Sequence, residues 1–155
     1  MREKFKIYLG KPITGRTPSE VFNYYNKMKE ELSEIGLMVL HPLVGKGDFR
    51  NDTIFTAGNY KNKSPVSSDH AIKNRDQFMV KYCDIVLINL LDTTKVSIGC
   101  VAELAWGNLL GKHTILCMEK GNVHEHAFME CADIIFETLD EAKKYLQTFV
   151  DQSFE

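Results

Sequence analysis

The sequence predicts one α/β domain over residues 1–155, built as a doubly wound, mostly parallel sheet flanked by helices. Three observations support this fold class. Segments typical of strands alternate with segments of helical periodicity, which favours a parallel sheet with right-handed crossovers. The run DIVLINLL at 84–91 is apolar on both faces, as a central parallel strand is. TPSE at 17–20 and TLDE at 138–141 are capping boxes that mark the starts of two helices.

The individual elements follow from the same patterns. We expect strands at 6–9, 37–42, 84–91, 113–118 and 133–136, and helices at 18–35, 69–82, 97–111, 124–131 and 138–150. The first helix has Thr17 as its N-cap and Pro18 in its first position, and Gly36 ends it. Pro42 closes the second strand. Residues 43–67 show no period, and a loop of this length is usually functional or mobile.

Composition and charge exclude several classes of protein. The hydrophobic share of 44% and charged share of 26% are typical of a soluble domain. A net charge of −2 gives no reason to expect a nucleic-acid polymer as partner. Cys83, Cys100, Cys117 and Cys131 lie far apart without a C-x-x-C pair, which favours reduced thiols. The amino terminus lacks the apolar stretch of a signal peptide, and no apolar run spans a bilayer. We therefore expect a cytoplasmic protein without a membrane partner.

The stretch IYLGKPITGRT at 7–17 raises the question of a phosphate loop. In flavodoxin-like and Rossmann-like sheets, the type expected here, ligands bind beyond the carboxyl ends of the strands. The spacing is close to that of a triphosphate-binding loop, but Arg16 stands where that loop has lysine. Pro12 also removes a backbone N–H from the loop. A plain turn remains possible, as does a looser anion site built from Thr14, Gly15 and the helix N-terminus.

Two acidic residues lie near the same predicted sheet edge. Glu103 lies within CVAELAW, after a turn that contains Ser97 and Gly99, where a hydroxyl and N–H groups can hold an anion. Glu103 is either an exposed residue of an amphipathic helix or a functional carboxylate. Asp76 is either a solvated acid beside Arg75 or a second carboxylate of the same site. Paired carboxylates suit cleavage of a glycosidic bond through an oxocarbenium-like transition state.

Several motifs together resemble the nucleoside 2-deoxyribosyltransferase family, which includes 2′-deoxynucleoside 5′-phosphate N-hydrolases and CMP hydrolases. The resembling stretches are KIYLGKPITGR, KNRDQFMVKYCDIVLINL, SIGCVAELAWGNLLGK, HAFM, ADIIF and TLDEA, in this order. The element S-x-G-x-x-x-E-L, followed by G-K and a strand, is the most specific of them. Residues 43–67 carry no matching motif.

The resemblance implies roles for the residues of these motifs. Glu103 is similar to the family's nucleophile, which attacks C1′ and forms a glycosyl ester. Asp76 is similar to the acid that positions the sugar or base and assists the leaving nucleobase. Tyr8 is similar to a tyrosine near the nucleophile, although a strand-end aromatic residue packed in the core is an equal alternative. Gly99 is similar to a glycine that allows close approach to the sugar.

The resemblance also gives a function for the loop after the first strand. In the family this loop, here with Gly10, Thr14, Gly15 and Arg16, covers the sugar and its 5′ substituent. Deoxyribosyltransferases acting on free nucleosides have an acid near the start of the nucleophile helix, whereas the monophosphate hydrolases have a serine. This sequence has Ser97 there, and a hydroxyl accommodates a phosphate that a carboxylate would repel. The loop is therefore interpreted as one wall of a monophosphate site.

His126 lies where family members insert a residue from a neighbouring subunit, which implies a homodimer or larger homo-oligomer. His124 and His126 are alternatively surface histidines, and two histidines alone form a poor metal site. We expect no metal ion and no cofactor.

The leading hypothesis is an enzyme that hydrolyses nucleoside or 2′-deoxynucleoside 5′-monophosphates. One alternative is base exchange between free deoxynucleosides, and another is a non-catalytic nucleotide-binding module. A dinucleotide oxidoreductase is disfavoured because the sequence lacks G-x-G-x-x-G.

Overall fold

The computed structural model describes residues 3–51, 54–55 and 65–154 and contains one five-stranded sheet. Its strands are β1 (Lys6–Gly10), β2 (Met38–Leu40), β3 (Ile85–Asn89), β4 (His113–Cys117) and β5 (Ile134–Phe136). Every pair of neighbouring strands is parallel, in the order β2-β1-β3-β4-β5. This is the flavodoxin-like strand order, so the predicted α/β fold is confirmed.

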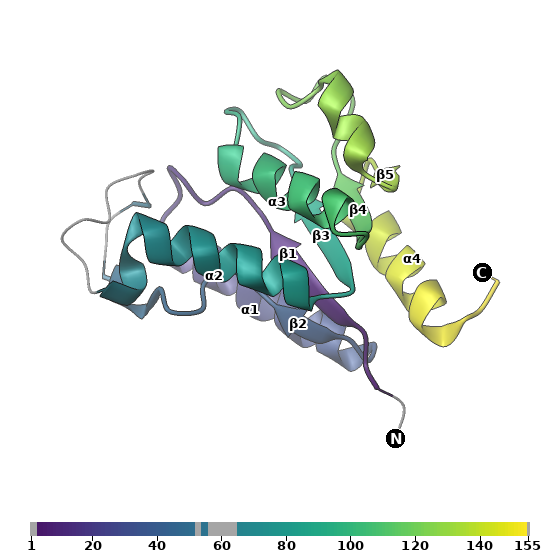
Figure 1. Cartoon of the computed structure of the whole chain (residues 1–155). Coiled ribbons are helices and arrows are strands. Elements are labelled where there is room, and N and C mark those ends of the chain that lie inside the picture. Colours follow the sequence, from purple (N-terminus) through teal and green to yellow (C-terminus); the bar gives the residue numbers. More distant parts are fainter. Residues whose placement is uncertain (1–2, 52–53, 56–64, 155) are drawn as a thin grey trace.

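Helices cover both faces of the sheet (Figure 1). They are α1 (Pro18–Glu34), α2 (Asp69–Tyr82), α3 (Ile98–Leu109) and α4 (Leu139–Asp151). One apolar cluster joins α1 and α4 to alternate strand residues such as Ile7 and Leu87. A second cluster joins α2 and α3 to the strand residues that point to the opposite face of the sheet, such as Tyr8 and Val86. The central strand β3 is therefore buried on both faces, which explains its continuous apolar run.

The helix starts agree with their sequence signals. Thr17 and Thr138 are N-caps of α1 and α4, and each forms both hydrogen bonds of a capping box with Glu20 and Glu141. The second strand is shorter than predicted, since β2 is an edge strand that pairs with β1 alone. The predicted helix at 124–131 is a 3-10 helix, η3 (Ala127–Cys131).

The long loop contains two short 3-10 helices, η1 (Gly47–Phe49) and η2 (Pro65–Ser67). Residues 52–53 and 56–64 of that predicted loop lie outside the described residues. All four cysteines are free. Within the described ranges, no helix is both long enough and apolar enough to cross a membrane.

α3 packs unusually close to the sheet. A Cβ atom on Gly107 would lie 2.9 Å from Val86 Cγ2 and 3.0 Å from Thr114 Cγ2. Only glycine lets the helix backbone approach β3 and β4 this closely, because any side chain would force the helix outward. This contact fixes the distance of α3 from the sheet and therefore the position of every side chain on its inner face.

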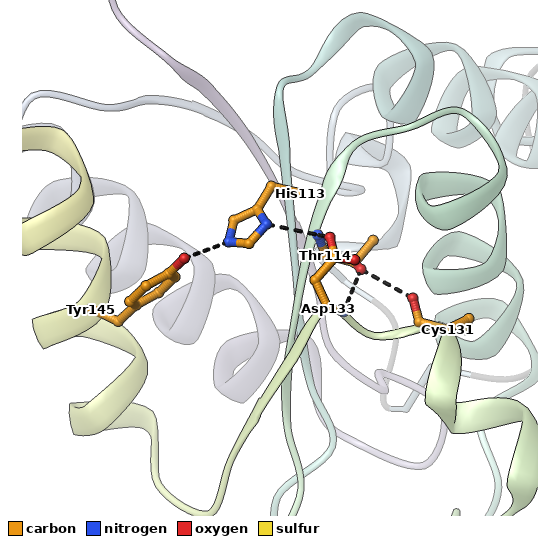
Figure 2. A network of polar contacts seen from close by, with 5 residues as sticks. All are labelled: His113, Thr114, Cys131, Asp133 and Tyr145. Carbon is orange, nitrogen blue, oxygen red and sulfur yellow. Dashed lines mark hydrogen bonds and ion pairs between the residues drawn. The ribbon is translucent and has the colours of Figure 1, made fainter.

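A polar network closes the opposite end of the sheet, where β4 begins (Figure 2). His113 Nε2 lies 2.7 Å from the Tyr145 hydroxyl of α4, and His113 Nδ1 lies 3.3 Å from Asp133 Oδ2. The same carboxylate accepts the N–H of Thr114, whose hydroxyl donates to the Cys131 carbonyl. The network therefore joins β4, α4 and the start of β5, at the amino ends of the strands.

Candidate active site

A cavity of about 360 Å³ lies at the carboxyl end of β1, between α2 and the N-terminus of α3. This is the edge of a parallel sheet at which ligands bind, and the volume suits a small molecule. Its walls include Thr14, Lys46, Asp76, Ser97, Gly99 and Glu103. The structure therefore brings together five of the residues proposed from sequence, and adds Lys46.

Glu103 lies on the buried face of α3 and is only 7% exposed. Its Oε2 atom has no hydrogen-bond partner among the described residues. Burial raises the pKa of Glu103 to about 8, with a further increase from the charge of Asp76 and an opposing effect of Tyr8 and Lys46. The exposed-glutamate alternative is therefore excluded. A buried carboxyl group without a partner destabilises the fold, and such groups concentrate at functional sites.

Asp76 reaches the same cavity from α2 and is also only 7% exposed. Its Oδ1 atom lacks a hydrogen-bond partner within the described chain. Burial raises the pKa of Asp76 to about 6, and the positive charges of Lys46 and Arg75 oppose that increase. Asp76 is therefore not the solvated surface acid of the alternative interpretation. The structure therefore places two carboxyl groups from two helices in one cavity, and the pKa of Glu103 is raised further than that of Asp76.

Two residues of β1 shape the surroundings of Glu103. Tyr8 is fully buried in the core cluster, yet its hydroxyl has no hydrogen-bond partner among the described residues. Burial and the charge of Glu103 raise the pKa of Tyr8 well above its ordinary value. Tyr8 is thus a core aromatic residue whose polar end faces the carboxylates. A Cβ atom on Gly10 would lie 2.6 Å from Glu103 Oε2, so glycine makes room for that carboxylate.

The N-terminus of α3 forms the other end of the cavity. Ser97 is the N-cap, and its Oγ accepts the N–H of Cys100 at 3.4 Å. Ser97, Gly99 and Thr14 all line the cavity. A Cβ atom on Gly99 would meet nothing within 4 Å, so this residue borders open space. A hydroxyl beside a helix N-terminus is a suitable environment for an anion.

The structure separates the remaining loop residues from this cavity. Gly15 and Arg16 line a neighbouring hollow of about 400 Å³, which shares Thr14 and Lys95 with the main cavity. The Gly15 N–H donates to the Phe55 carbonyl at 2.8 Å, with Gly15 at φ +82°. The turn is therefore held by a hydrogen bond to Phe55. Arg16 lies beside the cavity without lining it.

Sequence reasoning missed a buried histidine behind Ser97. His124 is 3% exposed, and its Nε2 accepts the Ser97 N–H at 2.8 Å. Its Nδ1 lies 2.8 Å from Asn122 Oδ1, so the ring carries its proton on Nδ1. Burial lowers the pKa of His124, which favours this neutral form. His126 instead caps η3, accepts the Phe128 N–H at 3.1 Å, and does not line the cavity.

Three lysines of the cavity wall were also missed: Lys11, Lys46 and Lys95. Lys11 directly follows β1 and Lys95 precedes α3, so their position at the carboxyl edge of the sheet could have been predicted from the sequence. Burial lowers the pKa of Lys11, whose ammonium lies 4.9 Å from the centre of the Tyr24 ring. Lys46 lies in the segment without periodicity, and no sequence signal identified it.

The fold and cavity define an α/β protein with two buried acids in a cavity at the carboxyl edge of its sheet. A sequence model of the nucleoside 2-deoxyribosyltransferase family matches residues 7–148. The chain therefore belongs to the nucleoside 2-deoxyribosyltransferase family, as the motifs predict. Among curated protein sequences, none matches this chain significantly.

Several solved structures share the fold of this chain. A 2-deoxyribosyltransferase of Bacillus psychrosaccharolyticus is 20% identical, with a TM-score of 0.62, over 90% of this chain and 91% of the other. The CMP N-glycosidase BcmB of Clostridium botulinum is 15% identical, with a TM-score of 0.56, over 93% and 98%. A conserved protein of Enterococcus faecalis is 13% identical, with a TM-score of 0.63, over 97% and 99%. At these identities the likeness concerns the fold.

Proposed function

We propose that this protein hydrolyses the N-glycosidic bond of nucleoside or 2′-deoxynucleoside 5′-monophosphates, releasing a nucleobase and a sugar phosphate. The observation that carries the proposal is the pair of buried carboxyl groups, Glu103 and Asp76, in one cavity with the capped N-terminus of α3. Membership of the family and the fold shared with a CMP N-glycosidase support it. A purely nucleotide-binding module would have no use for two buried acids that each have one oxygen atom without a hydrogen-bond partner among the described residues, so that alternative is disfavoured.

The mechanism uses one proton shared between the two acids. Ionised Glu103 attacks C1′, and the electron pair of the breaking C1′–N bond leaves with the nucleobase, which accepts a proton from Asp76. Water then hydrolyses the glycosyl ester while Asp76 takes up the proton, so both acids return to their starting forms. The pKa values of about 8 for Glu103 and about 6 for Asp76 describe a coupled pair that holds a single proton between these pH values. Because Glu103 has the higher pKa, the proton lies mostly on Glu103, and the reaction starts from the minor form of the pair in which Asp76 holds it.

The other end of the cavity is suited to a phosphate group. Thr14 and Ser97 contribute hydroxyls, and Lys11 and Lys95 contribute positive charge to the same wall. A substrate with its phosphate at the α3 N-terminus would place its sugar beside Glu103 and its base toward Asp76. Arg16 lies in the neighbouring hollow, so we assign it a supporting, longer-range role.

The phosphate assignment predicts substrate preference. Charge-assisted hydrogen bonds contribute roughly 1.5–3 kcal/mol, so kcat/KM for a deoxynucleoside monophosphate should exceed that for its free nucleoside by about 10-fold or more. Ser97→Asp should reverse this preference, because a carboxylate repels phosphate but accepts a bond from a 5′-hydroxyl. Chromatography of released nucleobase over a panel of substrates measures both effects.

Ser97→Asn is the matched control, since asparagine and aspartate are equally good N-caps and differ mainly in charge. It should keep the preference for monophosphates. Efficient use of free deoxynucleosides by the wild type, with base exchange when a second base is added, would instead identify a deoxyribosyltransferase. The covalent ester serves that reaction equally well, because a nucleobase can replace water in the second step.

We further propose that the chain forms at least a homodimer in which His126 reaches a neighbour's cavity. Large apolar side chains of α2, α3 and η3 are exposed, namely Phe78, Tyr82, Ile98, Leu109 and Phe128. His126 lies edge-to-face against Phe128, with ring centres 5.1 Å apart, so it belongs to this surface. Burial of such a surface against a second copy is a common basis of dimer formation.

A mixing experiment tests this arrangement. His126→Ala and Glu103→Gln should each be poorly active alone, whereas mixed dimers should regain part of the wild-type rate. In a mixed dimer, the cavity with intact Glu103 receives His126 from the other subunit. Light scattering at assay concentration should give the mass of a dimer or larger assembly. An active monomer, or mixtures no more active than the separate variants, would contradict the proposal.

A further inference from the structure

Lys46 is a buried lysine in the wall of the cavity. It is 3% exposed, and it shares that wall with Asp76 and Glu103. A lysine is rarely buried without opposite charge near it, because removing an ammonium group from water is costly. Lys46 has no place in the covalent mechanism described above, so its position requires a separate explanation.

The backbone around Lys46 is fixed rather than adaptable. The Lys46 N–H donates to the Leu43 carbonyl at 2.9 Å, and the Lys46 carbonyl accepts the Phe49 N–H at 3.1 Å. Phe49 is 2% exposed and packs against Phe55 with ring centres 5.8 Å apart. The preceding Gly45 has φ +74°, and a Cβ atom there would lie 2.8 Å from the Arg75 guanidinium carbon. The turn therefore anchors the lysine at a defined place beside α2.

Charged and titratable groups from two helices act on the Lys46 ammonium. From α2, the charge of Asp76 stabilises it and that of Arg75 opposes it; from α3, Glu103 stabilises it. Cys100 of α3 is close as well, but burial raises the pKa of its thiol so far that it stays neutral. Arg75 also forms a hydrogen bond away from Lys46, since its Nη1 donates to the Val66 carbonyl at 2.8 Å. Lys46 thus lies in the same cavity wall as both acids, and its charge acts on each of them.

We infer that Lys46 is a positioning residue for the carboxyl pair, whose buried ammonium group allows Glu103 and Asp76 to occupy one cavity while sharing a single proton. The inference concerns the charge balance of the site, and its catalytic consequence rests on the proposed function. Without this charge, two acids buried together would both hold their protons to higher pH, and a smaller share of Glu103 would be ionised at neutral pH.

The direction in which Lys46 shifts the pKa values follows from its charge. The charge of Lys46 lowers the pKa of both Glu103 and Asp76 relative to burial alone. Lys46→Met removes this charge and keeps the length of the side chain, so both pKa values should rise. Because the active form holds one proton, kcat/KM should follow a bell-shaped pH profile that moves as a whole to higher pH.

The pH profile of kcat/KM distinguishes this role from a merely structural one. At pH near 6, on the acid limb, Lys46→Met should be slower than the wild type by on the order of 10-fold, since one pKa unit corresponds to that factor. On the alkaline limb, near pH 9, it should equal or exceed the wild type, so the two profiles cross. Lys46→Arg keeps the charge and should retain the wild-type limbs. Lys144→Met removes an exposed lysine of α4 and should leave the profile unchanged.

A measurement without turnover separates this inference from the proposed reaction. Carbon-13 NMR of labelled side-chain carboxyl groups follows the titration of Glu103 and Asp76 directly, with Glu103→Gln and Asp76→Asn providing the assignments. Higher titration midpoints in Lys46→Met would support the inference even if no nucleobase were ever released. Unchanged midpoints, or a uniform loss of activity at every pH, would overturn it. If the methionine variant fails to fold, Lys46→Gln provides the same test.

Discussion

Glu103→Ala and Glu103→Gln should each release nucleobase more slowly than the wild type by roughly 10⁴-fold or more, because the nucleophile of a covalent mechanism has no substitute. Glu103 combines burial, a free carboxylate oxygen and a place in the cavity. Asp76 shares these features, and the match of Glu103 to the S-x-G-x-x-x-E-L motif is the reason for assigning Glu103 as the nucleophile. Chromatography of timed reactions measures the rate. Intact-protein mass spectrometry of quenched wild-type reactions should show a sugar-phosphate adduct that is missing from both variants.

Stability provides the control for correct folding. The pKa of Glu103 is about 8 in the folded protein and 4.5 in its ordinary environment, so wild-type stability falls as pH rises between these values. Glutamine does not titrate. Glu103→Gln should therefore be more stable than the wild type by about 1–3 kcal/mol near pH 8, and should show little difference near pH 4. Chemical unfolding at the two pH values checks this difference.

Two results would contradict the assignment of Glu103. Substantial nucleobase release by either variant would exclude the covalent mechanism. An inactive Glu103→Gln that is also less stable at pH 8 would show that its inactivity reflects damage to the fold. Inactivity together with greater stability is expected of a residue retained for function at the expense of stability.

The fold could be predicted from sequence because its signals are local. The capping threonines Thr17 and Thr138, the run 84–91 and the alternation of elements each depend on neighbouring residues, and all reappear in the structure. The burial of Glu103 could not be decided in this way, because α3 is apolar around most of its circumference. The position of that residue depends on how closely Gly107 allows the helix to approach the sheet.

The parts of the site that sequence reasoning missed depend on distant partners. His124 was expected at the surface. It is buried because Ser97 and Asn122, far from each other in sequence, satisfy its two ring nitrogens. Lys46 lies in a segment without periodicity, so its burial follows only from the packing of that segment against α2 and α3. Such tertiary contacts leave no pattern in a single sequence.

Asp76→Asn should lower kcat by about 10²–10⁴-fold, the usual contribution of a general acid, because the amide keeps the size of the side chain but supplies no proton to the leaving base. The loss should be largest for nucleobases that are poor leaving groups and smallest for those that depart readily as anions. A series of deoxyuridine monophosphates with increasingly acidic substituted uracils measures this dependence.

The same substitution makes a second prediction of definite sign. The charge of Asp76 raises the pKa of Glu103, so Asp76→Asn should lower that pKa, and carbon-13 NMR of the labelled Glu103 carboxyl group measures the change. Asp69→Asn is the matched control, since it removes an exposed carboxylate from the first turn of the same helix and should leave both rate and pH profile nearly unchanged. An Asp76→Asn variant with wild-type kcat, the same response to leaving-group acidity and an unchanged pKa of Glu103 would show that Asp76 neither donates the proton nor interacts with the nucleophile.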